Sequence, residues 1–93
     1  MMHLVVYDIE EDDVRLRVAR ALKNVGQRVQ KSVFECRMDA KEMKNLLVAL
    51  KHILKDSPEG NIRLYRLCTD CFAKSVELGE ENPSIYGEAF III

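Results

Sequence analysis

The hydrophobic residues of this chain form short blocks whose spacing alternates between that of strands and that of helices. The first block, residues 2–9, contains the unbroken apolar run Leu4-Val5-Val6-Tyr7 and predicts a central strand buried on both faces. A helix is predicted next, capped by Asp12 or Asp13 and stopped by Gly26, because apolar residues recur there at helical spacing. These residues are Val14, Val18, Ala21, Leu22 and Val25.

The later blocks continue the alternation. Residues 27–38 are rich in β-forming side chains and predict either one long strand or two short strands joined by a tight turn near Lys31–Ser32. Residues 40–55 place apolar side chains on one helical face behind the candidate cap Asp39, which predicts the second helix. Downstream we expect a strand at 61–68, a short irregular or helical connection at 69–73, a short strand at 74–78, a loop at 80–86 and a β-prone segment at 89–93.

This order of elements predicts an α+β ferredoxin-like fold, a βαββαβ sandwich with an extra C-terminal strand. Residues 1–79 are expected to form the domain, and residues 80–93 a loop and strand that dock on a partner subunit. Two helices cover only one face of such a sheet, whereas the first strand is apolar on both faces. We therefore expect a second copy of the chain on the open face, which gives a sheet-to-sheet homodimer.

Composition supports a small globular domain without a membrane segment. The chain has 93 residues, of which 48% are hydrophobic and 31% charged, and no apolar run is long enough to span a bilayer. The first residues do not follow the pattern of a secretory signal, so we expect a cytoplasmic protein. The sequence also lacks the glycine-rich phosphate loops, zinc-protease motif and nucleophile elbow of the common enzyme classes.

Charge is informative through its distribution. The net charge is only −1, but the segment from Val14 to Arg37 contains seven basic residues and one acid. The basic residues are Arg15, Arg17, Arg20, Lys23, Arg28, Lys31 and Arg37. Such a segment either binds phosphates or forms an ordinary charged helix and strand surface, and charge alone does not separate the two.

Asp8 is the first candidate for chemistry, because it ends the predicted first strand just before a run of acids. A carboxylate in this place either binds Mg²⁺ together with water and phosphate oxygens or only hydrogen-bonds the next turn. One carboxylate is a sparse metal site, and a two-fold dimer would supply a second Asp8. The spacing of the residues leaves both interpretations open.

Three further candidates have an equally simple structural alternative. Arg15 and Arg17 either bracket a phosphate backbone or pair with nearby acids. Phe34 either stacks on a base or packs in the core. The C-x-x-C pair Cys68 and Cys71 is half of a zinc site, lacks the partner motif that zinc usually needs, and is interpreted as structural or incidental.

Several segments together resemble the Cas2 family of small CRISPR-associated proteins that take part in spacer acquisition. They are Leu4-Val5-Val6-Tyr7-Asp8-Ile9, Asp12 and Asp13 before Arg15 and Arg17, Gly26 to Cys36 with its Ser-Val-Phe-Glu-Cys stretch, Ile62 to Cys68, and Leu78-Gly79. A related toxin-like ribonuclease family shares the first of these segments. The resemblance extends from about residue 2 to residue 79.

The resemblance implies a dimeric scaffold that bridges two dimers of the CRISPR integrase and positions DNA during spacer acquisition. It also implies a metal-dependent endonuclease for RNA or DNA, in which Asp8 is catalytic and holds Mg²⁺ (or Mn²⁺) between subunits. Arg15, Arg17, Arg28 and Phe34 would then contact DNA or single-stranded RNA. It gives Cys68 and Cys71 no catalytic role.

Three functions follow as hypotheses: a metal-dependent phosphodiesterase, a purely non-catalytic DNA-binding scaffold, and a regulatory domain that binds a small molecule. A toxin-like ribonuclease is a further alternative for the first. The sequence contains no evident general base, so a nuclease of this kind would need a metal-bound hydroxide as its nucleophile.

Overall fold

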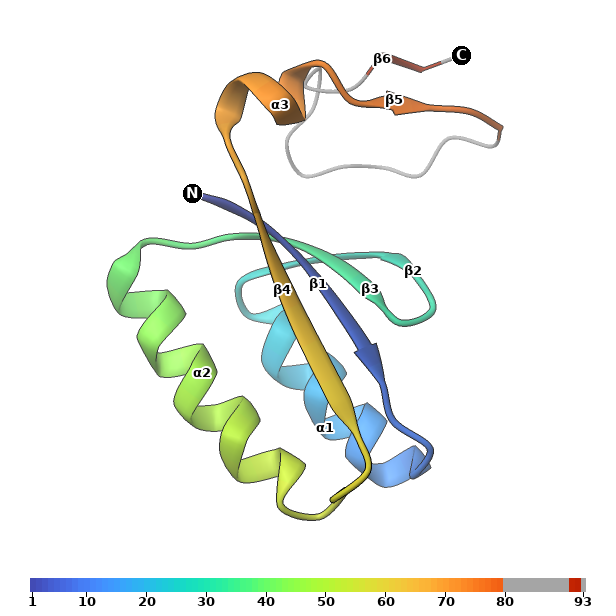
Figure 1. Ribbon diagram of the computed structural model, residues 1–93, viewed down its shortest axis with the longest axis vertical. Helices are drawn as coiled ribbons and strands as arrows, with labels where there is room; N and C mark the ends of the chain where they lie inside the picture. Colours follow the sequence, from blue (N-terminus) through green and yellow to red (C-terminus); the bar gives the residue numbers. More distant parts are fainter. Residues whose placement is uncertain (80–90, 93) are drawn as a thin grey trace.

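A computed structural model describes residues 1–79 and 91–92 of the chain, and Figure 1 shows its elements in order. The strands are β1 (Met2–Asp8), β2 (Gly26–Gln30), β3 (Val33–Arg37), β4 (Asn61–Leu67), β5 (Val76–Glu77) and β6 (Ile91–Ile92). The helices are α1 (Asp12–Lys23), α2 (Ala40–Leu54) and the short α3 (Thr69–Ala73). The turn at Lys31–Ser32 separates β2 from β3, so the two-strand alternative for residues 27–38 is confirmed.

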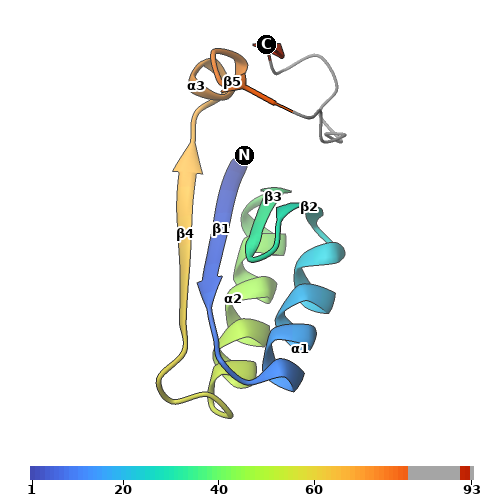
Figure 2. The ribbon, with the colours of Figure 1, turned by 90° about the vertical axis from the view of Figure 1, so that its right-hand side faces the viewer.

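The four long strands form one antiparallel sheet in the order β2-β3-β1-β4. Figure 2, which views this sheet edge-on, shows that α1 and α2 lie side by side on the same face. This is the predicted ferredoxin-like arrangement, in which each helix connects strands that are not neighbours in the sheet. The predicted fold class is confirmed.

The core lies between that face of the sheet and the two helices. Register places Val5 of β1 opposite Phe34 of β3 and Leu64 of β4, and these three side chains share the helical face. Val5 and Phe34 are fully buried, and Leu64 packs on the cluster that they form with the helices. Burying a side chain of this size contributes roughly 1.5–3 kcal/mol, so these contacts determine which face of the sheet the helices cover.

The opposite face of the sheet is partly apolar, as the unbroken apolar run in β1 predicted. Leu4 and Val6 alternate with the core residues of β1 and are half-buried. Tyr65, which lies opposite Leu4 in β4, is 47% exposed although its ring is large and apolar. An apolar strip on an open sheet face is suited to a protein partner.

The two helix caps differ in how well the sequence predicted them. Asp39 caps α2 in a full capping box, because its carboxylate accepts from the Glu42 N–H at 2.8 Å and Glu42 accepts from the Asp39 N–H at 3.1 Å. The predicted cap of α1 was wrong. Glu11 occupies that position without a capping hydrogen bond, and Asp12 and Asp13 lie inside the first turn. There their charges still complement the positive end of the helix.

At the C-terminal end, β6 pairs in parallel with β5 of the same chain. The loop expected at 80–86 and most of the segment expected at 89–93 lie outside the described residues. Docking of this segment on a partner subunit therefore stays a prediction. No helix in the described part of the chain has the length and apolar character needed to cross a bilayer.

Candidate functional site

Asp8 is the last residue of β1 and is exposed. It lies opposite Asn61 at the start of β4 and, by the alternation of strand residues, on the same face as Leu4 and Val6. This is the open face of the sheet. The strand therefore delivers the carboxylate to the surface on which a second copy of the chain is expected.

A small recess of about 120 Å³ lies beside Asp8 between the β1–α1 loop and the loop that precedes β4. Its lining is strongly acidic and consists of Asp8, Glu10, Glu11, Ser57, Glu59 and Gly60. Two carboxylates besides Asp8, those of Glu10 and Glu59, form no hydrogen bond or ion pair within the described chain. The recess therefore has the oxygen chemistry that hard divalent cations prefer.

One wall of the recess is fixed by a buried hydroxyl. Ser57 is 2% exposed and donates to the Glu11 carboxylate at 2.7 Å, and this hydrogen bond is the main reason why the pKa of Glu11 lies below its usual value. A Cβ at Gly60 would lie 2.6 Å from the Ser57 hydroxyl oxygen and 3.2 Å from Ile9, so a side chain there would displace the wall. The loop before β4 is thus tied to the loop after β1.

Arg15 holds the loop that follows Asp8. Its guanidinium donates to the carbonyl oxygens of Ile9 at 2.9 Å and Glu10 at 2.8 Å, and it also pairs with Asp12. Because these partners come directly after Asp8, Arg15 fixes the backbone at the end of β1. The structure therefore gives this residue a positioning contact that sequence spacing did not reveal.

The other two predicted arginines also have partners inside the chain. Arg17 donates to Asp56 at 2.7 Å and so connects α1 to the end of α2. Arg28 lies over the ring of Phe34 with its guanidinium carbon 5.4 Å from the ring centroid, a cation–π contact across the β2–β3 pair. Within the described residues, no hydrogen bond or ion pair joins any of these three arginines to Asp8 or to another of the three.

The structure corrects the base-stacking interpretation of Phe34. This ring is fully buried on the helical face, 6.3 Å from the ring of Tyr7 between centroids, and is unavailable to a base. The core alternative is the one that the structure shows. The reason is the register: Phe34 lies opposite Val5, whose side chain points toward the helices.

A divalent metal fits this site only in part. No group of three or more His, Cys, Asp or Glu side chains in residues 1–79 and 91–92 is arranged to hold a metal ion. Asp8 nevertheless offers one exposed carboxylate with the acidic recess beside it. This is half of the donor set expected for a site shared between two copies of the chain, with water and phosphate oxygens as the other ligands.

The cysteine pair lies far along the chain, at the start of α3. Cys68 caps this helix, and its sulfur accepts from the Cys71 N–H at 3.1 Å. The contact between the two thiols lowers the pKa of Cys68 and raises that of Cys71. The pair forms no disulfide, and its capping contact agrees with the structural interpretation.

Comparison with known proteins gives the family. The model of the family "CRISPR associated protein Cas2" matches residues 1–75. The chain belongs to the Cas2 family. It is 36% identical over 93 residues to the CRISPR-associated endoribonuclease Cas2 1 of Chloroflexus aurantiacus, covering 100% of both chains. It is 38% identical over 90 residues to the CRISPR-associated endonuclease Cas2 of Halalkalibacterium halodurans, covering 91% of this chain and 92% of that one.

Solved Cas2 structures share the fold of this family member. The crystal structure of Streptococcus pyogenes Cas2 matches with a TM-score of 0.68 and 33% identity over 75% of this chain and 89% of that one. A chain in a partial Cas6-RT-Cas1–Cas2 complex matches with a TM-score of 0.69 and 34% identity over 80% of this chain and 86% of that one. The resemblance stated from sequence and the ferredoxin-like architecture are therefore both confirmed.

The individual arginines predicted to contact nucleic acid all have partners inside the chain, whereas the rest of the basic segment was considered only as a group. Arg20, Lys23, Lys31 and Arg37 are exposed, and their side chains form no ion pair or hydrogen bond in the described chain. Only their position in the basic segment could have indicated them. Contacts inside the chain distinguish these two sets of basic residues, and such contacts become visible only in three dimensions.

Proposed function

We propose that this Cas2 family member acts in CRISPR adaptation as a homodimer that binds nucleic acid and hydrolyses its phosphodiester bonds with a divalent metal held by Asp8. The observation that carries the proposal is the position of Asp8 at the end of β1, on the open face of the sheet and beside an acidic recess. The names of its relatives, endoribonuclease and endonuclease, support the reaction class.

In this proposal Asp8 of each subunit contributes one carboxylate to a shared Mg²⁺ or Mn²⁺ site. When bound, the metal lowers the pKa of a water molecule and neutralises the charge that develops on the phosphate. Arg15 keeps the loop after Asp8 in place through the Ile9 and Glu10 carbonyls, and Glu10 and Glu59 add negative potential. Exposed cations of the basic segment hold the phosphate backbone of DNA or single-stranded RNA.

The test compares the wild type with Asp8→Asn, a substitution that removes the charge and keeps the shape. We expect Mg²⁺-dependent cleavage of RNA or DNA to disappear while the oligomeric state in sedimentation is unchanged. Asp13→Asn is the matched control, because Asp13 lies in the first turn of α1 and does not line the recess. Full cleavage by Asp8→Asn, or a monomeric wild type, would overturn the proposal.

The second candidate is a non-catalytic scaffold that binds DNA and bridges two integrase dimers. A specific observation favours it, because the described residues offer no cluster of three metal-binding side chains and the recess contains no histidine or lysine to act as a base. The presence of Cas1 and Cas2 in the matching complex supports such a partner. Under this candidate, Asp8→Asn retains spacer acquisition, and charge reversal at Arg20 and Lys23 abolishes it.

A further inference from the structure

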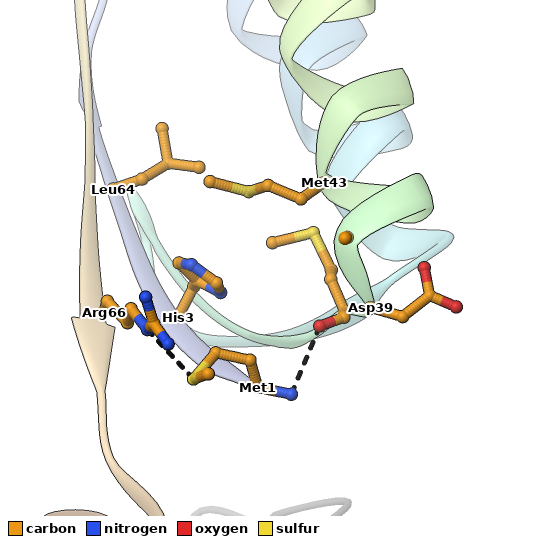
Figure 3. A pocket seen from close by; sticks show the side chains of 8 residues that line it. Met1, His3, Asp39, Met43, Leu64 and Arg66 are labelled. Atoms are coloured by element: carbon orange, nitrogen blue, oxygen red, sulfur yellow. Dashed lines mark hydrogen bonds between the residues drawn. The ribbon is translucent and has the colours of Figure 1, made fainter.

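A second and larger hollow, of about 450 Å³, lies at the opposite end of β1 from Asp8. It is bounded by the start of β1, the end of β4 and the first turn of α2. Figure 3 shows Leu64 from β4 and Met43 from α2 pointing toward each other across it, with His3 beside them. The volume falls within the range of small-molecule sites, and most of the lining is apolar.

His3 forms one wall of this hollow. The side chain is 7% exposed, and its Nδ1 atom is enclosed and has no hydrogen-bond partner in the described structure. Buried nitrogen atoms are nearly always hydrogen-bonded, so the packing around this ring is incomplete on its polar side. Burial is the main reason why the pKa of His3 lies below its usual value of 6.5. The ring is therefore neutral at pH 7, and one of its two nitrogen atoms donates a hydrogen bond while the other accepts one.

Arg66 adds a positive charge at the rim of the hollow. Its Nε atom donates to the sulfur of Met1 at 3.1 Å, and no carboxylate in the described residues pairs with its guanidinium. A thioether is a weak acceptor, so a bound anion would replace this contact at little cost. Asp39, the acid at the rim, already caps α2, and Figure 3 shows its carboxylate pointing away from the hollow.

We propose that this hollow binds one nucleotide unit, with the base between Met43 and Leu64 beside the His3 ring and its phosphate on Arg66. Methionine and leucine side chains adapt to a flat ring, and methionine sulfur contacts aromatic edges favourably. The His3 ring borders the hollow and would form one wall of the base site. The choice of a nucleotide over another flat anion depends on the proposed function.

Two sources can supply this chemistry: a free mononucleotide, or a nucleotide unstacked from a single strand. The experiment follows the imidazole resonances of His3 by NMR in the full-length protein during titration with the four nucleoside monophosphates and with a single-stranded oligonucleotide. Shifts with both ligands identify a mononucleotide site, and shifts with the oligonucleotide alone identify an unstacked base. Unchanged His3 resonances at saturating oligonucleotide would overturn the inference.

Affinity measurements on variants provide the second readout. Arg66→Gln is expected to weaken single-strand binding about tenfold and to reduce the salt slope by about one. The control is Arg63→Gln on the same strand. Register places Arg63 opposite Val6, on the open face and away from the hollow, so the His3 shifts persist in this variant. Equal affinity of Arg66→Gln and the wild type would also overturn the inference.

Failure of this inference is distinguishable from failure of the proposed function. Asp8→Asn removes cleavage and leaves the His3 shifts intact, because Asp8 lies at the other end of β1. Cleavage by a wild-type protein whose His3 resonances do not respond rejects only the nucleotide pocket. His3 shifts in a protein that does not cleave reject only the nuclease.

Discussion

Replacing Arg15 separates a positioning residue from a phosphate-binding one. Its guanidinium bridges the carbonyl oxygens of Ile9 and Glu10 and pairs with Asp12. Arg15→Lys keeps the charge, but a single ammonium group cannot reproduce this fork. Arg15→Gln removes the charge as well. If Arg15 acts by positioning, both variants are impaired; if it contacts a phosphate, the lysine variant retains most of its function.

The magnitude follows from these contacts. Hydrogen bonds from charged donors contribute about 1.5–3 kcal/mol each when well buried. The Arg15 side chain is 35% exposed, which screens them, and surface pairs such as the one with Asp12 contribute about 0–1 kcal/mol. We therefore expect Arg15→Gln to lower the free energy of unfolding by about 1–3 kcal/mol, and Arg15→Lys by about half of that.

Urea unfolding followed by circular dichroism at fixed protein concentration measures this loss, since the stability of a dimer depends on concentration. Metal-dependent cleavage should fall in both variants, whereas the salt slope of nucleic-acid binding should stay unchanged. Arg20→Lys is the control, because Arg20 lies on the same helix, is exposed and has no partner among the described residues. A stable, cleaving Arg15→Lys together with a reduced salt slope in Arg15→Gln would refute the positioning role.

Three further predictions address other parts of the molecule. Alkylation followed by mass spectrometry should show that Cys68 reacts before Cys71 and that Cys36 reacts last. Burial raises the pKa of Cys36 to about 11, whereas the contact with Cys71 lowers the pKa of Cys68. An early reaction of Cys36 would contradict this order. The pKa of His3 is lower in the folded state than its unfolded value of 6.5, so stability is full above pH 6.5 and falls as the pH drops below it. His3→Asn should flatten this pH dependence in urea unfolding, and an identical dependence contradicts it. Gly26→Ala should lower the free energy of unfolding by about 1–3 kcal/mol. The alanine Cβ would clash with the Glu35 carbonyl and lie 2.6 Å from the Cys36 sulfur. An unchanged midpoint of urea unfolding would contradict this expectation.

The fold was predictable because local signals and burial agree in this chain. The apolar run of β1 and the apolar faces of α1 and α2 each indicated one element, and the resulting order of elements required the two-strand alternative around Lys31–Ser32. The cap of α1 was not predictable from the same rules. Glu11 is hydrogen-bonded to Ser57, which is 46 residues away in sequence, and Asp12 is paired with Arg15. Tertiary contacts decided that position.

The candidate site was predictable only in part, and one cause left its alternatives open. Sequence identifies charges and aromatic rings but not their partners. Phe34 is in the core because of its register with Val5, and Arg17 is paired with Asp56 because α1 and α2 pack together. The unpaired Nδ1 of His3 had no sequence signal at all, since a histidine in a strand is ordinary until its surroundings are known.

These pairings also change how strongly the chain can attract nucleic acid. The segment from Val14 to Arg37 carries a formal charge of +6, but Arg15 and Arg17 are neutralised by Asp12 and Asp56, which lie outside it. An effective charge near +4 remains to interact with phosphates. Since each neutralised phosphate contributes about 0.9 to the salt slope on duplex DNA, this segment of one chain should contribute a slope no steeper than about −4. This salt slope is shallower than that of a strong DNA-binding protein. Firm duplex binding at physiological salt therefore requires the charges of a second subunit or of an integrase partner.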